Sequence, residues 1–142
     1  IPIFYGYFLS KTQQSIITEH IPNLNLSQFY TNIQHHNQKY VSMWTDTFKA
    51  KLTFGIACTI MHFHSFNVIH RHLNSSIVYF DDNYNPKITD FSDSKISFHE
   101  DYYYGGIKTP YYDSPELKSG ETISNKTDVY FIWRNFIINC SG

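Results

Sequence analysis

Two polar clusters contain the residues of this chain whose types could do chemistry. The first is His70-Arg71-His72, and the second begins at Asp90, after an apolar segment and a turn. Imidazole exchanges protons near neutral pH, guanidinium pairs bidentately with phosphate, and a carboxylate is an oxygen ligand of the kind that Mg²⁺ requires. These residue types could exchange a proton, pair with an anion or hold a cation. A carboxylate that follows a strand can also be a capping or turn residue, so that interpretation of Asp90 stays open.

The pattern of apolar residues predicts the elements that position these clusters. Helical spacing over residues 45–65 predicts the strongest helix, and residues 127–139 predict a second, mostly apolar helix. A shorter helix begins at residue 26. The predicted strands are residues 3–8, 15–21, 77–80 and 87–89, of which the first two form a hairpin. The predicted loops are residues 34–40, 68–76 and 92–113. This mixture indicates an α+β fold.

Composition narrows the class of protein. The 142 residues suffice for one domain, and neither a repeat nor a linker divides them. The net charge is −1 and only 16% of residues are charged, without a basic stripe, so nucleic acid and anionic membrane are poor partners. The longest apolar run, residues 129–138, is too short to cross a bilayer. The 18% aromatic content reflects either a compositional bias or a recognition surface.

The two cysteines and the chain start also bear on the class. Cys58 and Cys140 have no zinc or redox spacing, which favours reduced thiols and a cytoplasmic location. The sequence opens on Ile1-Pro2 without an initiator methionine or a cleavage signal, as the middle of a domain would.

Four motifs occur in a fixed order along the chain. Residues 68–73 are similar to I-I-H-R-D-L, and residues 80–91 to L-D-E-N-L-N-P-K-I-S-D-F without a gap. Residues 109–116 are similar to T-P-Y-Y-M-S-P-E, and residues 126–130 to K-S-D-V-Y. Together they resemble a eukaryotic protein kinase domain, closest to the tyrosine-kinase-like serine/threonine branch.

The resemblance covers nearly all of the chain and implies a partial protein-kinase-like fold. Residues 1–21 would be a hairpin and hinge from the end of the N-lobe. Residues 22–142 would be a mostly helical C-lobe with the remnant of a catalytic loop, an activation segment and the central helix. ATP and Mg²⁺ are the cofactors that the resemblance implies.

The chemical positions of the family are only partly kept. By resemblance, His72 replaces the base aspartate, Asn74 replaces a lysine that faces the transferred phosphate, and Ile77 replaces a metal-binding asparagine. Asp90 remains as the residue that bridges Mg²⁺ to the phosphates. Loss of a base costs about 10²–10⁴-fold in rate, and loss of metal stabilisation costs several kcal/mol more. The expected result is a pseudokinase. His72 itself is either a substitute base or a residue that has changed by structural drift.

The resemblance also assigns a nucleotide pocket and a set of structural positions. Pocket residues would be Thr18 as the gatekeeper, Glu19 to Ile21 as the hinge, Asn25 near the ribose and Tyr79 below the adenine. Tyr79 either fills part of this pocket or packs sideways into the C-lobe. Structural and regulatory positions would be His70 and Phe91 in the hydrophobic column that links the lobes, Arg71 as a phosphate receptor, Thr109 in the substrate loop, Glu116 as an ion-pair residue, and Asp128 as the anchor of the catalytic loop.

Two further patterns have alternative interpretations. His62, His64, His70 and His72 form two His-x-His pairs that could bind a transition metal. His64 and His70 are also ordinary kinase positions, which explains them without a metal. Residues 102–104 are three tyrosines after two acidic residues, either a phosphorylation target or an unmodified surface loop.

Three functional hypotheses follow. The first is a kinase-fold signalling module that binds a protein partner or an active kinase, with a nucleotide as a further ligand. The second is a weakly active, atypical serine/threonine kinase that uses His72 and one metal ion. The third is a truncated fragment without a function of its own, whose exposed apolar surface would make it aggregate or require a partner.

Overall fold

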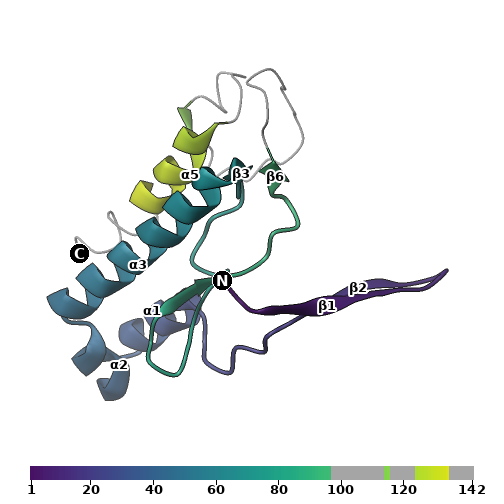
Figure 1. Ribbon diagram of the computed structural model, residues 1–142. Coiled ribbons are helices and arrows are strands. Elements are labelled where there is room, and N and C mark those ends of the chain that lie inside the picture. The colour runs from purple at the N-terminus through teal and green to yellow at the C-terminus, as the bar shows by residue number, and fades with distance from the viewer. Residues whose placement is uncertain (97–113, 116–123, 135–142) are drawn as a thin grey trace.

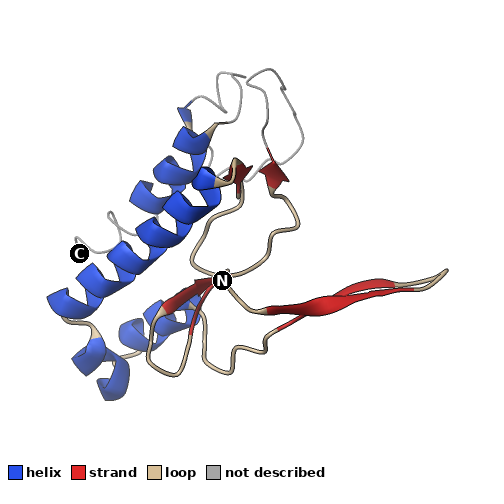
Figure 2. Ribbon diagram, viewed as in Figure 1, coloured by secondary structure: helices blue, strands red, loops and turns tan. Residues whose placement is uncertain are grey.

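A computed structural model describes residues 1–96, 114–115 and 124–134 of the chain. Within these residues the fold combines helices with two-stranded antiparallel sheets, as the sequence predicts (Figures 1 and 2). The helices are α1 (Leu26–Gln34), α2 (Gln38–Met43), α3 (Asp46–Ser65) and α5 (Asn125–Ile132). The strand pairs are β1 (Phe4–Leu9) with β2 (Gln14–Thr18), β3 (Val68–Ile69) with β6 (Lys95–Ile96), and β4 (Val78–Phe80) with β5 (Pro86–Ile88).

Helix α3 is the long central element, and its start is fixed locally. The Thr45 side chain accepts a hydrogen bond from the Phe48 backbone N–H at 3.2 Å, which satisfies one of the free donors at the helix start. The buried face of α3 carries apolar residues three and four positions apart. These residues are Leu52, Ile56, Ile60 and Phe63. The apolar residues that occur at helical spacing in the sequence therefore lie on the face of α3 that packs into the core.

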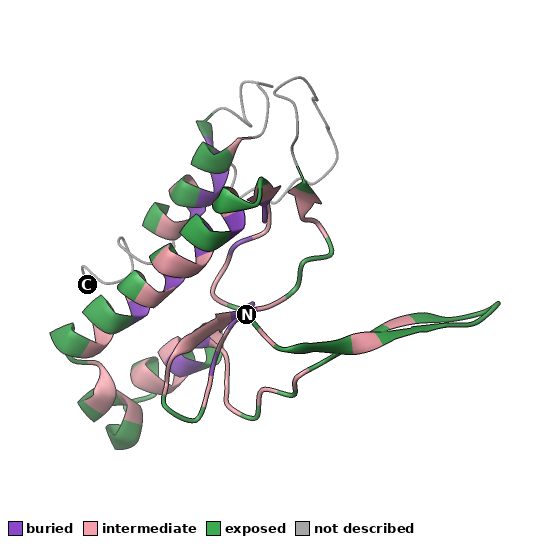
Figure 3. Cartoon of the chain, in the orientation of Figure 1, coloured by how far each residue is buried: buried purple, intermediate pink, exposed green. Residues whose placement is uncertain are grey.

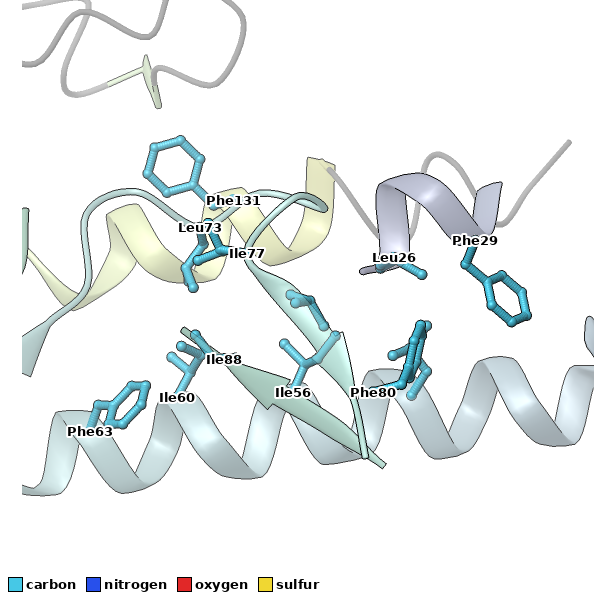
Figure 4. Packing of buried hydrophobic residues seen from close by; sticks show 12 residues of the cluster. Leu26, Phe29, Ile56, Ile60, Phe63, Leu73, Ile77, Phe80, Ile88 and Phe131 are labelled. Atoms are coloured by element: carbon cyan, nitrogen blue, oxygen red, sulfur yellow. The ribbon is translucent and has the colours of Figure 1, made fainter. Parts of the chain in front are cut away.

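The core forms where α3 packs against the β4–β5 pair and α5 (Figure 4). Val78, Phe80 and Ile88 come from the strands, and Phe131 comes from α5. Each large apolar side chain buried in this way contributes about 1.5–3 kcal/mol. Leu26 and Phe29 of α1 complete the far end of the cluster. The core thus fixes the β4–β5 pair in place. The loop before β4 contains the cluster of residues 70–72, and the loop after β5 contains Asp90.

The prediction that residues 34–40 form a loop is wrong in part, because α2 begins at Gln38. The Asn37 side chain caps this helix by accepting a hydrogen bond from the Lys39 N–H at 3.2 Å. Tyr40 then packs edge-on against Phe29, with ring centroids 5.1 Å apart. The polar composition of the segment concealed a short helix that tertiary packing stabilises.

The predicted loops at 68–76 and 92–113 also need correction, because β3 and β6 lie within them and pair with each other. Val68 is opposite Ile96 and Ile69 is opposite Lys95. Two residues per strand give too little alternation to be seen in a sequence. At the other boundaries, β2 ends at Thr18, three residues earlier than expected, and α5 starts at Asn125, two residues earlier. The end of the predicted helix 127–139 lies outside the described residues.

The β1–β2 hairpin projects from the rest of the chain and is exposed on both sides (Figures 1 and 3). Its large apolar side chains are more than half exposed: Phe4, Tyr5, Tyr7, Phe8, Leu9, Ile16 and Ile17. A two-stranded hairpin is marginal alone in water. No helix in the described part of the chain has both the length and the apolar character needed to cross a membrane.

Candidate active site

A cavity of about 770 Å³ lies where the end of the hairpin meets the β4–β5 pair and residues 89–92. Its lining includes the expected pocket residues Thr18, Glu19, Ile21, Tyr79 and Asp90. Phe91 lines it as well. Asn25, His72 and Asn74 do not belong to the lining. The structure therefore brings the predicted hinge and Asp90 together around one space, and places Tyr79 on its wall.

The hinge side of the cavity is held by Glu19. Its carboxylate forms an ion pair with Lys87 of β5 and accepts a hydrogen bond from the Ile3 N–H at 2.9 Å. The Lys87 hydrogen bond, followed by the Ile3 N–H, lowers the pKa of Glu19. Lys87 was missed at the sequence level. Its partner lies 68 positions away, and no local pattern relates two residues so far apart.

Next to Glu19, the backbone is free to bind a ligand. Among the described residues, the N–H and C=O groups of His20 and Ile21 take part in no hydrogen bond. Both residues line the cavity. Free donors and acceptors at the edge of a largely apolar space suit a flat ligand with polar edges.

Asn25 has a structural task. Its side chain accepts the Gln28 N–H at 2.9 Å, while the Gln28 side chain accepts the Asn25 N–H at 3.0 Å. This reciprocal capping box starts α1. The Asn25 backbone also forms a bridge to Tyr79. Asn25 therefore contacts Tyr79, a residue of the cavity wall, without lining the cavity itself.

Asp128 joins α5 to α3 and to the first polar cluster. Its fully buried carboxylate accepts hydrogen bonds at 2.9 Å from the backbone N–H groups of His70 and Arg71. His64 Nε2 lies 2.9 Å from the same carboxylate. Arg71 has a φ of 71°, a conformation that a non-glycine residue keeps only when its surroundings impose it. The Asp128 carboxylate imposes this conformation by binding two consecutive backbone N–H groups, those of His70 and Arg71.

His70 links this anchor to the cavity wall. The ring is buried, its Nε2 is 3.1 Å from the Thr89 carbonyl oxygen, and its centroid lies 5.0 Å from that of Phe91. Phe63 of α3 packs edge-on against Phe91 at 5.1 Å. The three rings form a column between the core and the cavity. Arg71, in contrast, has a buried Nε with no hydrogen-bond partner.

Acidification is expected to destabilise the protein through His70. Burial lowers the pKa of His70, so as the pH falls through the ordinary value of about 6.5 the unfolded chain takes up a proton that the folded chain does not. Stability present above that pH is then lost, by at most about 1.4 kcal/mol per pH unit, until the folded-state pKa is passed. Urea unfolding between about pH 7.5 and about pH 5 should show this loss, and His70→Gln should remove it. Equal slopes for both proteins would contradict the assignment.

The residues at the remaining chemical positions are not aimed at the cavity. The Asn74 side chain donates to the His72 carbonyl at 3.1 Å and accepts the Ser76 N–H at 2.8 Å, which closes the loop on itself. Ile77 is only 6% exposed and belongs to the apolar core together with Leu73. The His72 N–H points to His70 Nδ1, 3.4 Å away.

Asp90 borders the cavity in a constrained conformation, with φ at 55°. Its Oδ1 accepts hydrogen bonds from the Ser92 hydroxyl at 2.6 Å and from the Ser92 N–H at 3.3 Å. The Ser92 hydroxyl is the main reason that the pKa of Asp90 is lowered. The carboxylate is thus ionised and faces the cavity, and it also caps the turn that follows it. The structure thus confirms the cap at the turn, while the role of Asp90 as a Mg²⁺ ligand stays a prediction from the family resemblance.

The described residues do not gather a cluster of several metal-binding side chains. Asp90 supplies one carboxylate, Glu19 is engaged with Lys87, and Ile77 offers no oxygen. No group of three His, Cys, Asp or Glu side chains in the described ranges could hold an ion. The four histidines of the His-x-His pairs have other contacts, since His64 binds Asp128 and His62 packs on Phe66. Thr109, Glu116 and residues 102–104 lie outside the described residues.

Comparison with known proteins fits this arrangement. Residues 1–132 match the family model of the protein kinase domain. The chain belongs to the protein kinase family. It is similar to a probable receptor-like protein kinase of Arabidopsis thaliana, 30% identical over 133 residues, which cover 88% of this chain and 26% of that protein. It is also similar to a probable serine/threonine-protein kinase of Dictyostelium discoideum, 31% identical over 127 residues, which cover 89% of this chain and 9% of that protein.

A third relative, a cysteine-rich receptor-like protein kinase of Arabidopsis thaliana, is 31% identical over 131 residues, covering 88% of this chain and 20% of that protein. The chain therefore spans about a quarter or less of the length of these relatives. ATP and Mg²⁺ are implied for the family by resemblance.

Proposed function

We propose that this kinase domain has lost efficient transfer of phosphate from ATP to protein serine or threonine, and that it acts in signalling by binding a protein partner or an active kinase. The observation that carries the proposal is the placement of Ile77. An isoleucine packed into the apolar core with 6% exposure has no oxygen to offer a metal ion. The position that holds a metal in the family is, on this proposal, part of the core.

The His72 position supports the same proposal. Its Nδ1 lies 3.5 Å from Asp93 Oδ2, so the ring faces a neighbouring turn. The residue is outside the cavity lining. A neutral imidazole also lacks the negative charge with which a carboxylate orients a hydroxyl, and a protonated one repels the hydroxyl proton. These properties disfavour His72 as an efficient substitute for the family base.

The cavity itself remains suitable for a ligand. The free backbone groups of His20 and Ile21 and the apolar walls suit a nucleobase. No lysine or arginine belongs to the described lining, and Asp90 and Glu19 are its acidic groups. We propose that a nucleotide binds through its nucleobase at the hinge, and that its triphosphate and metal ion are not firmly held.

A second candidate is a weakly active serine/threonine kinase. The observation that favours it is the presence of an ionised Asp90 on the cavity wall, where one metal ion could still be held. On this alternative His72 accepts the substrate proton through Nε2.

Phosphotransfer by the intact protein tests the proposal. With labelled ATP, Mg²⁺ and general protein substrates, the native protein should give no more product than its Asp90→Ala variant. Binding of the base is measured separately, by titrating adenosine and ATP with and without Mg²⁺. Transfer well above the Asp90→Ala background would overturn the proposal and favour the weakly active kinase.

A further inference from the structure

A histidine and a carboxylate face each other where the loop after β3 passes the turn after Asp90. His72 Nδ1 lies 3.5 Å from Asp93 Oδ2, with about a quarter to a third of each side chain exposed. Nδ1 is shielded from water and makes no hydrogen bond. The other ring nitrogen, Nε2, is neither bonded nor shielded in this way. The ring thus presents one nitrogen to a carboxylate and the other to solvent.

This arrangement makes the contact depend on protonation. A nitrogen that faces a carboxylate keeps its proton, because a lone pair there would be repelled. When Nε2 takes up a second proton, the ring becomes a cation beside an anion, and the two attract. When Nε2 loses that proton, only the weaker attraction of a neutral N–H for the carboxylate remains. Histidine side chains make this change between about pH 5 and pH 8.

Within the described residues, the two segments also meet in a short strand pair and in contacts made by Ser94 and Phe91. β3 pairs with β6 over two residues per strand. The Ser94 hydroxyl donates to the His70 carbonyl oxygen at 3.4 Å, and the ring of Phe91 packs on that of His70. The His72–Asp93 contact is the ionisable one of this set. A change in its strength therefore bears on how firmly residues 92–96 are held.

Several charged or titratable groups lie near His72. Asp93 faces the ring directly, and Asp90 is close enough that His72 adds to the lowering of the Asp90 pKa, after the larger effect of Ser92. His70 lies on the same loop and opposes a charge on His72, but burial lowers the pKa of His70 and keeps it neutral. Arg71, next to His72, and Lys95, two residues after Asp93, are positively charged neighbours in the sequence.

We propose that His72 and Asp93 form a pH-dependent clasp, which holds residues 92–96 against the loop of residues 70–73 when His72 is protonated. The clasp loosens when His72 becomes neutral. Ser92, at the start of the held segment, lines the cavity and caps Asp90, so the clasp controls the order of one cavity wall. This device works whether or not the protein transfers phosphate, because it needs only the two side chains.

Hydrogen exchange in the intact protein tests the clasp. Amide protection of residues 92–96 is measured at about pH 5.5 and about pH 8, corrected for the intrinsic effect of pH on exchange. The native protein should lose protection by about two- to five-fold at the higher pH, the range expected for a partly exposed ion pair. Asp93→Asn and His72→Gln should both have the lower protection at both pH values.

The controls separate the clasp from other histidines. His36→Asn is a matched change at an exposed histidine with a φ of 56°, which asparagine tolerates, and should keep the native pH dependence. If native protection is the same at both pH values, the proposal is wrong. It is equally wrong if the loss of protection at the higher pH persists in Asp93→Asn, because a group other than the clasp would then cause it; the effect of His70 has the opposite direction.

Discussion

Replacing Asp128 by asparagine is expected to lower the free energy of unfolding by about 2–4 kcal/mol. The fully buried carboxylate of Asp128 receives three donors through two oxygens: Arg71 N–H at one, and His70 N–H with His64 Nε2 at the other. An amide has a single oxygen. Whichever way it turns, its NH₂ group faces at least one backbone N–H, and that donor loses its partner in a buried place. Urea unfolding measures the loss.

Asp46→Asn is the matched control for this change. It replaces the same carboxylate by the same amide, but Asp46 is fully exposed and pairs only with Lys49 at 3.4 Å. Exposed pairs of this kind are worth about 1 kcal/mol or less. The contrast between the two variants therefore isolates burial and the three donors. If Asp128→Asn costs no more than Asp46→Asn, the anchor is not what holds the loop of residues 70–73.

The helices and strands around the core were predictable because their patterns of apolar residues in the sequence are long or pronounced. Five apolar residues at helical spacing mark α3 in the sequence. Four of them form its buried face, and the fifth, Phe48, packs partly buried against the same core. The β4–β5 pair follows from two short apolar runs separated by a turn rich in polar residues. Such features depend on neighbours in the sequence, so the sequence contains the information needed to find them.

Elements that depend on distant contacts were missed. α2 has a polar sequence and is stabilised by Tyr40 packing on Phe29, and β6 exists only because β3 lies beside it. The same limit applies to the site. The hinge residues and Asp90 were placed through their resemblance to a family, and they line one cavity. Lys87 lies within the motif of residues 80–91 and Asp93 lies just after it, but the motif says nothing of their partners. The pairing of Lys87 with Glu19 and of Asp93 with His72 becomes visible only in three dimensions.

Restoring the family residues at two positions is expected to raise phosphotransfer by about 10²-fold or more in the intact protein. The variant is His72→Asp with Ile77→Asn, which supplies a carboxylate for the substrate hydroxyl and an oxygen for a metal ion. Initial rates with labelled ATP and Mg²⁺, expressed per folded protein, measure the gain. A native protein already as active as this variant would favour the weakly active kinase instead.

The Ile77 change has a structural cost that its control must match. Ile77 is buried in the apolar core, so an asparagine there loses methyl contacts and buries an amide, at about 2–5 kcal/mol. Ile77→Ala loses comparable packing without providing an oxygen. His72→Asp with Ile77→Ala should therefore be as destabilised as the restored variant but should lack its metal-dependent gain. Equal activity of the two would mean that the oxygen at position 77 does not matter.

Asp93 is the remaining obstacle to restoration. His72 Nδ1 now lies 3.5 Å from Asp93 Oδ2. An aspartate at position 72 would bring a second carboxylate close to that of Asp93, and the two negative charges would repel each other. Adding Asp93→Asn to the restored pair removes this repulsion, so the triple variant should be more active than the double variant. If the triple variant is no more active than the double variant, the carboxylate at position 72 does not lie close to Asp93. A restored pair that stays inactive even with Asp93→Asn would locate the loss of activity outside these three positions.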